Sequence, residues 1–223
     1  MGKRLLFLTI KANSVKASSP YSAAFTGGGF LHAELTAMLP LLLSPDRDAL
    51  VKDEILHNNI LRINSEVSRK RIIAELRRRV DALPREFWNF YQNLSGYAQK
   101  IAVFYVLLKT YRLLFDLHIG VTVRRWQLSK TTLDVDDVKI FFNELASKDE
   151  FVSSWSDKTQ DKVRSSYMSI LRKINILDEK GDTLNRVPIT DCDFSYFIDN
   201  GENWFLEACL LRPFEIARIG RAS

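Results

Sequence analysis

Residues 62–85 read RINSEVSRKRIIAELRRRVDALPR, and the spacing of their side chains decides the fold class of this chain. Apolar residues recur here at intervals of three and four, as they do on a helix that packs one face on a core. These residues are Ile72, Ile73, Leu76, Val80 and Leu83. The spacing predicts a helix over Ser65–Leu83, with a serine near its start as the cap and Pro84 at its end.

The same stretch is strongly basic. It holds eight Arg and Lys residues against three acidic residues, and this excess equals the formal net charge of +5 of the whole chain. Arg71, Arg78 and Arg85 recur every seven residues, away from the apolar face. A row of cations on one side of a helix favours binding to a polyanion such as a phosphate backbone. The alternative is a solvated charged face that pairs with acidic residues elsewhere in the chain.

Composition limits the class of protein. Hydrophobic residues make up 46% of the 223 residues, which is enough for a core. A pI near 9.2 favours an anionic partner. Cys192 and Cys209 form neither a metal motif nor a disulfide framework, and reduced thiols are the default in the cytoplasm. The apolar run Leu5–Ile10 is too short for a signal peptide, and the apolar segment Ile101–Leu117 contains three charged residues. We therefore expect a cytoplasmic protein without a membrane span.

Helical spacing recurs along most of the chain, which predicts an all-α fold. Further helices are expected over Phe30–Leu43, Asp46–Asn58, Phe87–Leu94, Tyr97–His118, Leu133–Ser147, Lys158–Ile176 and Trp204–Leu211. Asp134, Asp136 and Asp137 fall in the first turn of one of these helices, where acidic residues suit the helix dipole. We interpret them as a cap rather than as a metal site.

The expected helix Lys158–Ile176 has a second basic face. Its apolar face is formed by Val163, Tyr167, Ile170, Leu171 and Ile174. Cations mixed with small hydroxyl residues on the other face suit a helix that approaches a groove closely. The segment Ile176–Leu184 then has apolar ends around a polar turn that contains Gly181, which predicts a small hairpin. Two helices followed by a hairpin are typical of a winged helix, so we predict a helical bundle with helix-turn-helix or winged-helix-like parts.

The polar stretch Trp126–Thr132 suggests a division of the chain. We expect an N-terminal extension at residues 1–20, a first helical domain at residues 21–128 and a second, winged-helix-like domain at residues 129–223. Each of the two domains then contributes one basic helix. Whether the two basic helices share one face of the molecule does not follow from the sequence.

These patterns predict two contacts with a nucleic acid. The candidate residues are Arg69, Lys70, Arg71, Arg77 and Arg78 on the first helix, and Lys158, Lys162, Arg164, Ser165, Ser169, Arg172 and Lys173 on the second. Contacts with phosphates position a protein but carry no sequence information, so we expect a weak sequence preference.

No motif in the sequence requires catalysis. His32, His57 and His118 have no second histidine or cysteine at metal-ligand spacing. Gly27–Gly29 is not followed by the Lys and Ser or Thr of a phosphate-binding loop, so a turn before a helix is the simpler interpretation. We therefore expect a protein that is not an enzyme and that holds no cofactor or metal.

Aromatic residues provide a further candidate contact. The cluster Phe87–Tyr91 could stack on unpaired bases, although such clusters more often form a core where helices meet. Trp126 follows Arg124 and Arg125 and is a second candidate for a contact with bases.

Several motifs resemble those of the BrxA family of BREX phage-defence systems. They are YSAAFTGGGF at Tyr21–Phe30 with Glu34 after it, NNIL at Asn58–Leu61, SRKR at Ser68–Arg71 and ELRRRV at Glu75–Val80. These motifs are structural rather than catalytic. The resemblance implies a small, all-helical cytoplasmic protein that binds DNA within a multi-gene system, which modifies host DNA and blocks phage replication.

Three hypotheses for function follow. The first is a non-enzymatic component of such a system that binds double-stranded DNA with weak sequence preference. The second is an adaptor that holds other BREX proteins together, with its arginine face against an acidic protein surface. The third is RNA binding, in which the same cations act together with aromatic residues on unpaired bases.

Overall fold

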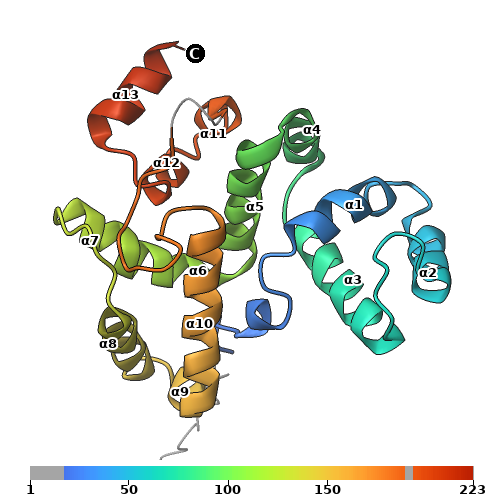
Figure 1. The fold of residues 1–223 in the computed structure, drawn as a ribbon, viewed down its shortest axis with the longest axis horizontal. Helices are drawn as coiled ribbons and strands as arrows, with labels where there is room; N and C mark the ends of the chain where they lie inside the picture. Colours follow the sequence, from blue (N-terminus) through green and yellow to red (C-terminus); the bar gives the residue numbers. More distant parts are fainter. Residues whose placement is uncertain (1–17, 189–192, 223) are drawn as a thin grey trace, which may run out of the picture.

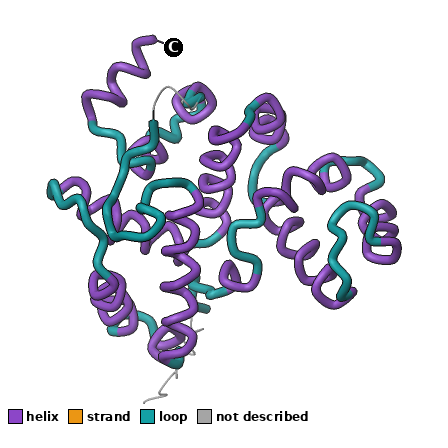
Figure 2. Tube along the Cα trace, in the orientation of Figure 1, coloured by secondary structure: helices purple, strands orange, loops and turns teal. Residues whose placement is uncertain are grey.

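The computed structural model describes residues 18–188 and 193–222 (Figure 1). Residues 1–17, which include most of the expected N-terminal extension and its apolar run, lie outside the described part. Within that part the protein is mainly helical, as predicted, and no segment is drawn as a strand (Figure 2). None of the described helices is long and apolar enough to cross a membrane.

The first helices form a small packed group. A short 3-10 helix, η1 (Ala24–Gly27), leads into α1 (His32–Leu42), α2 (Arg47–His57) and α3 (Glu66–Asp81), and each of these three α-helices contacts the other two. Ser65 caps α3 as predicted, because its hydroxyl accepts a hydrogen bond from the Ser68 amide at 3.3 Å.

The expected row of arginines is shorter than predicted. Helix α3 ends at Asp81, and Arg85 is the first residue of the next helix, α4 (Arg85–Asn93). The Arg85 guanidinium donates a hydrogen bond to the Leu43 carbonyl at 2.6 Å. Arg71 and Arg78 are therefore the only members of the row that lie on α3.

The expected helix Tyr97–His118 is interrupted. The backbone leaves the helical region at Tyr111, with φ −122° and ψ 103°, so the prediction of one continuous helix was wrong. The chain forms α5 (Gly96–Thr110), α6 (Arg112–Leu117), the π-helical stretch η2 (His118–Val123) and α7 (Arg124–Gln127). The Tyr111 hydroxyl donates a hydrogen bond to the buried Glu75 carboxylate of α3. The spacing of apolar residues along one segment does not predict such a contact with another helix.

The C-terminal half continues with α8 (Val135–Ala146), α9 (Glu150–Ser153) and α10 (Asp157–Lys173). Asp134 caps α8, since its carboxylate accepts a hydrogen bond from the Asp136 amide at 2.9 Å. The Asp137 carboxylate in turn accepts a hydrogen bond from the Asp134 amide at 2.8 Å. The interpretation of these acidic residues as a cap is confirmed.

A small hairpin follows α10, as predicted. Leu177 pairs with Leu184 in an antiparallel bridge, and the Asp178 amide donates a hydrogen bond to the Thr183 carbonyl at 2.9 Å. Thr183 also pairs with Thr132, which precedes α8. The hairpin is therefore fixed to the segment between α7 and α8.

Three helices complete the chain: α11 (Ser195–Asp199), α12 (Trp204–Ala208) and α13 (Pro213–Ala222). The expected helix Trp204–Leu211 ends three residues early. The last helix was not predicted, because Pro213 reads as a stop signal, whereas here it is the first helical residue, where its missing N–H costs nothing.

The aromatic cluster Phe87–Tyr91 belongs to the core, which is the interpretation that the sequence favoured. Phe87, Trp88 and Tyr91 are at most 1% exposed. The Trp88 indole donates a hydrogen bond to the Val80 carbonyl at 3.0 Å. Trp126 packs against the same core, and Arg212 lies over its ring at 5.9 Å from the centroid. The rings of Phe87, Trp88 and Tyr91 are therefore not available for stacking on bases.

A buried polar network joins η2, α10 and α12. His118 is fully buried, and its Nε2 donates a hydrogen bond to the Ala208 carbonyl at 2.8 Å. Its Nδ1 then accepts from the Tyr167 hydroxyl at 2.9 Å, and that hydroxyl accepts from the Thr122 hydroxyl at 2.5 Å. Burial lowers the pKa of His118 from 6.5 to about 4, so the folded protein keeps this ring neutral.

We expect His118 to make stability depend on pH. As the pH falls from 6.5 towards 4, His118 of the unfolded chain takes up a proton that the folded chain does not bind. The free energy of unfolding should therefore fall by roughly 3 kcal/mol across this window. Urea titrations at several pH values measure it. The variant His118→Gln should lose this pH dependence of the free energy of unfolding. The control His57→Gln, at an exposed ring, should retain it. Equal pH profiles for His118→Gln and the wild type would contradict the assignment.

Candidate nucleic-acid interface

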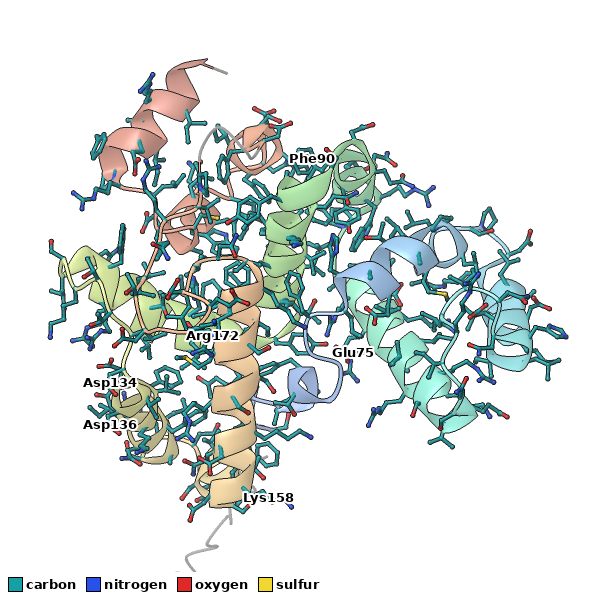
Figure 3. The ribbon with its side chains drawn as sticks, in the orientation of Figure 1. Glu75, Phe90, Asp134, Asp136, Lys158 and Arg172 are labelled. Carbon is teal, nitrogen blue, oxygen red and sulfur yellow. The ribbon has the colours of Figure 1, made fainter. Side chains whose placement is uncertain are left out.

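The predicted residues of α10 lie mostly on one exposed face of that helix. Ser156 caps the helix, with its hydroxyl 3.3 Å from the Thr159 amide, and the apolar side packs into the core. The opposite side carries Lys158, Lys162, Ser165, Ser169, Arg172 and Lys173, which we call the α10 basic face. Lys158 and Arg172 lie near the two ends of the helix (Figure 3). The basic face thus extends along the whole of α10.

Arg164 does not belong to this face. Its guanidinium forms an ion pair with Asp161 at 2.9 Å, and it lines a groove between α8 and α10 together with Val138 and Phe142. The side chain therefore points towards α8. Helical geometry explains the difference, because successive residues are about 100° apart and Arg164 lies about 120° from Lys158.

The cations of the α10 basic face keep their charge unneutralised. Within the described ranges, 18–188 and 193–222, Lys158, Lys162 and Lys173 form no ion pair within 4 Å, and neither does Arg172. The Arg172 guanidinium makes one long contact of 3.5 Å with the Gly181 carbonyl. This face therefore presents net positive charge to solvent.

Arg69 is placed differently from the prediction. It is only 7% exposed, and its guanidinium donates hydrogen bonds to the carbonyls of Ile55 at 2.8 Å and Ile63 at 2.6 Å. These bonds satisfy the end of α2 and the loop that follows it. Its donors face the protein interior, so we exclude Arg69 from the candidate interface.

The other cations of α3 are largely paired with acidic residues. Lys70 contacts Glu66 at 2.6 Å, Arg77 contacts Asp48 at 2.7 Å, and Arg78 contacts Glu75 at 3.3 Å. The pairs of Lys70 and Arg77 have exposed acidic partners, so they are weak and can exchange, whereas Glu75 is buried. Arg71 is exposed and makes no ion pair with a described residue. Most exposed cations of α3 thus pair with acidic residues, which agrees with the alternative of a solvated charged face. The cations of the α10 basic face are not paired in this way.

A buried arginine that we did not propose as a site residue organises this region. Arg79 is fully buried and forms an ion pair with Glu75 at 2.9 Å. It also donates hydrogen bonds to the carbonyls of Gly29 at 2.7 Å and Phe30 at 2.8 Å. Burial lowers the pKa of Arg79, and the charge of Glu75 opposes that shift. The sequence carries a signal for this role, since residues 72, 76, 79 and 83 share one helical face.

Two of the three glycines before α1 occupy positions that disfavour other residues, one by close packing and one by its backbone conformation. A Cβ atom on Gly28 would lie 2.8 Å from the Leu31 side chain and 3.0 Å from Cγ of Glu75. Gly29 has φ +65°, a conformation that favours glycine. Gly27–Gly29 is therefore a tight turn held by Arg79, as the simpler interpretation of the sequence had it.

The chain segment 24–32, which includes η1 and the start of α1, lies between the two basic helices. Gly27 and Gly28 line a groove of about 220 Å³ with Arg71 and Arg78 of α3. Phe30 and His32 line a groove of about 610 Å³ that includes residues of α10. Helix η1 also contacts α10, and Figure 1 shows it between α10 and α3. The two basic helices thus border opposite sides of one connecting segment.

Comparison with known proteins relates the chain to a family. A family model described as BrxA matches residues 19–204. A protein named BREX protein BrxA, from Bacillus cereus (strain H3081.97), is 26% identical over 174 residues, which cover 78% of this chain and 87% of that protein. The crystal structure of an uncharacterized protein from Magnetospirillum magneticum has a TM-score of 0.69 and 22% identity, and the match covers 86% of this chain and 98% of that one. This structural likeness shows a shared fold.

Proposed function

This chain belongs to the BrxA family of BREX phage-defence systems, and from that premise we propose that it is a non-enzymatic cytoplasmic component that binds double-stranded DNA. One observation carries the proposal, namely the unneutralised α10 basic face. Four cations project from it along one side of one helix, and two serines lie among them. Phosphates are the partners that such a surface attracts most strongly, with little dependence on base sequence.

The order of elements supports α10 as the helix that enters a DNA groove. After α6 and α7 comes Thr132, which pairs with Thr183 of the hairpin. Helices α8, α9 and α10 follow, and the hairpin at residues 176–185 comes after them. In a winged helix the last helix before the hairpin is the one that contacts DNA in the major groove. The division of the chain near residue 128 remains a prediction.

The second contact that we propose lies on α3. Arg71 and Arg78 line the groove beside Gly27 and Gly28, on the side of α3 that borders the connecting segment. Together with Lys158, Lys162, Arg172 and Lys173 they give six cations for phosphates. Arg78 lines this groove although it also contacts Glu75 at 3.3 Å. Lys70, Arg77 and Arg164 are paired with acidic residues, line neither this groove nor the α10 basic face, and would contribute less.

The turn of the hairpin opposes DNA binding. The turn carries three exposed acidic residues, Asp178, Glu179 and Asp182, around the exposed Lys180. The carbonyl of Gly181 in the same turn contacts Arg172, so these acidic residues lie near the α10 basic face. We expect the variant Glu179→Gln/Asp182→Asn to bind a DNA duplex about fivefold more tightly, because two surface charges that repel phosphate are removed. Fluorescence anisotropy measures this affinity. The control Glu86→Gln/Asp199→Asn makes the same change of net charge on α4 and α11; an equal gain in that control would mean that total charge alone sets the affinity.

The adaptor function has one specific observation in its favour. Leu128 and Ile140 are 63% and 57% exposed, and both line a groove of about 200 Å³ with Arg124 and Lys130. Exposed apolar residues beside cations suit a contact with a protein partner. RNA binding has less support, because most of the aromatic cluster is buried.

A mobility shift separates these functions. Purified protein is mixed with an unrelated DNA duplex, and a single-stranded RNA is added as competitor. We expect a shift at low salt that the RNA does not remove. Loss of the shift to the RNA would favour RNA binding. No shift, together with BREX proteins that co-purify after nuclease treatment, would favour the adaptor.

A further inference from the structure

The groove of about 610 Å³ beside the C-terminal end of α10 brings together cations from distant parts of the chain. Lys100 of α5 lines it together with Arg172 and Lys173 of α10, and His32 at the start of α1 lines it as well. Lys100 was not among the residues predicted from the sequence, because 72 residues separate it from Arg172. The fold creates this cluster by placing three helices around one hollow.

The charge of this groove is not balanced. Lys100, Arg172 and Lys173 form no ion pair with any residue of the described ranges, and Glu179 is the one acidic residue among those that line the groove. Many other cations of the molecule are paired, among them Arg47, Arg77, Arg112 and Arg125. Three unpaired cations that line one concave surface favour an anionic ligand.

His32 adds a polar group without a partner. Its Nε2 atom is buried and has no hydrogen-bond partner among the described residues. Burial and the nearby charge of Lys100 lower the pKa of His32, in agreement with positive charge around the groove. His32 is the first residue of α1, whose start has no side-chain cap, so the positive end of this helix dipole lies beside the groove.

We propose that this groove binds a phosphate group, held by Lys100, Arg172 and Lys173. Its volume falls within the range of about 300–1,000 Å³ of small-molecule sites, so it admits a nucleotide unit as well as a single phosphate. The phosphate belongs either to the DNA backbone or to a free polyphosphate such as a nucleotide. Only the first source rests on the proposed function; the second is independent of it.

The first arm of the test uses inorganic pyrophosphate. Isothermal titration compares the wild type with Lys100→Gln and with the control Lys52→Gln, at an exposed lysine of α2 outside the groove. We expect Lys100→Gln to weaken pyrophosphate binding about tenfold, as for loss of one hydrogen bond to a charged group, and Lys52→Gln to have no effect. Lys100 is exposed, and circular dichroism verifies that both variants keep their helices.

The second arm uses a DNA duplex. If the groove holds a backbone phosphate, Lys100→Gln should weaken duplex binding and reduce the magnitude of the log–log salt slope by about one, whereas Lys52→Gln should leave both unchanged. If Lys100→Gln weakens the binding of pyrophosphate but not that of the duplex, the ligand is a free polyphosphate. A Lys100→Gln variant that matches Lys52→Gln in both arms overturns the inference. If the wild type binds no DNA, the proposed function fails, and the pyrophosphate arm still decides the groove.

Discussion

Reversal of two cations on the α10 basic face, in the variant Lys162→Glu/Arg172→Glu, is expected to weaken duplex binding by about 100-fold or more. Each substitution removes a charged contact worth about 1.5–3 kcal/mol and adds repulsion of phosphate. Neither cation forms an ion pair with a described residue, so the melting temperature should change little. Fluorescence anisotropy with a labelled duplex measures binding, and thermal unfolding monitors the fold.

The matched control for this variant lies on α8 and on the side of α10 that faces α8, away from the α10 basic face. Lys139→Glu/Arg164→Glu changes the net charge equally, at two cations that line the groove between α8 and α10. We expect it to retain most of the affinity. Equal losses in the two double variants would show that total charge, and not the α10 basic face, determines binding.

The substitution Arg79→Leu is expected to have the largest effect on stability, a loss of about 3–5 kcal/mol. It leaves the Glu75 carboxylate, which is 9% exposed, without its buried partner, and it removes the donors to the Gly29 and Phe30 carbonyls. Urea unfolding measures the change. Arg71→Leu on the same helix serves as the control, because Arg71 is exposed and makes no ion pair with a described residue.

Arg79→Leu should also weaken duplex binding, although Arg79 itself touches no ligand. Its hydrogen bonds hold the segment between the two basic helices, and that segment lines both grooves. Stability equal to that of Arg71→Leu would contradict the assigned role. Rescue by Arg79→Lys should be poor, since a lysine ammonium cannot reproduce the planar geometry of the guanidinium bonds.

The sequence predicted the parts of the structure that depend on local periodicity. The cap of α3 at Ser65, the acidic cap of α8 and the hairpin after α10 follow from patterns within a few residues. The exposed side of α10 follows in the same way, because its apolar residues fix which side is buried. Local patterns do not show how helices meet, so the relation between α3 and α10 came only from the structure.

The features that were wrongly predicted or not predicted involve contacts between distant segments. Arg69 and Arg79 lie at positions of α3 that face the core, and each satisfies backbone carbonyls outside α3. Charge alone made Arg69 look like a surface residue. Tyr111, where the expected helix breaks, contacts Glu75 of α3, and the groove cation Lys100 belongs to a helix that otherwise reads as core. The spacing of residues along α3 indicates that Arg69 and Arg79 face the core, but the partners of these contacts lie on other segments, which a local pattern does not identify.

The salt dependence of duplex binding by the wild type tests the central claim most directly. Affinity is measured by fluorescence anisotropy from about 50 to 200 mM salt, where release of counterions governs binding. With roughly six phosphates neutralised by the cations of α10 and α3, we expect a log–log slope of about −5. A slope near zero, or no binding at the lowest salt, would contradict a DNA interface built from these cations.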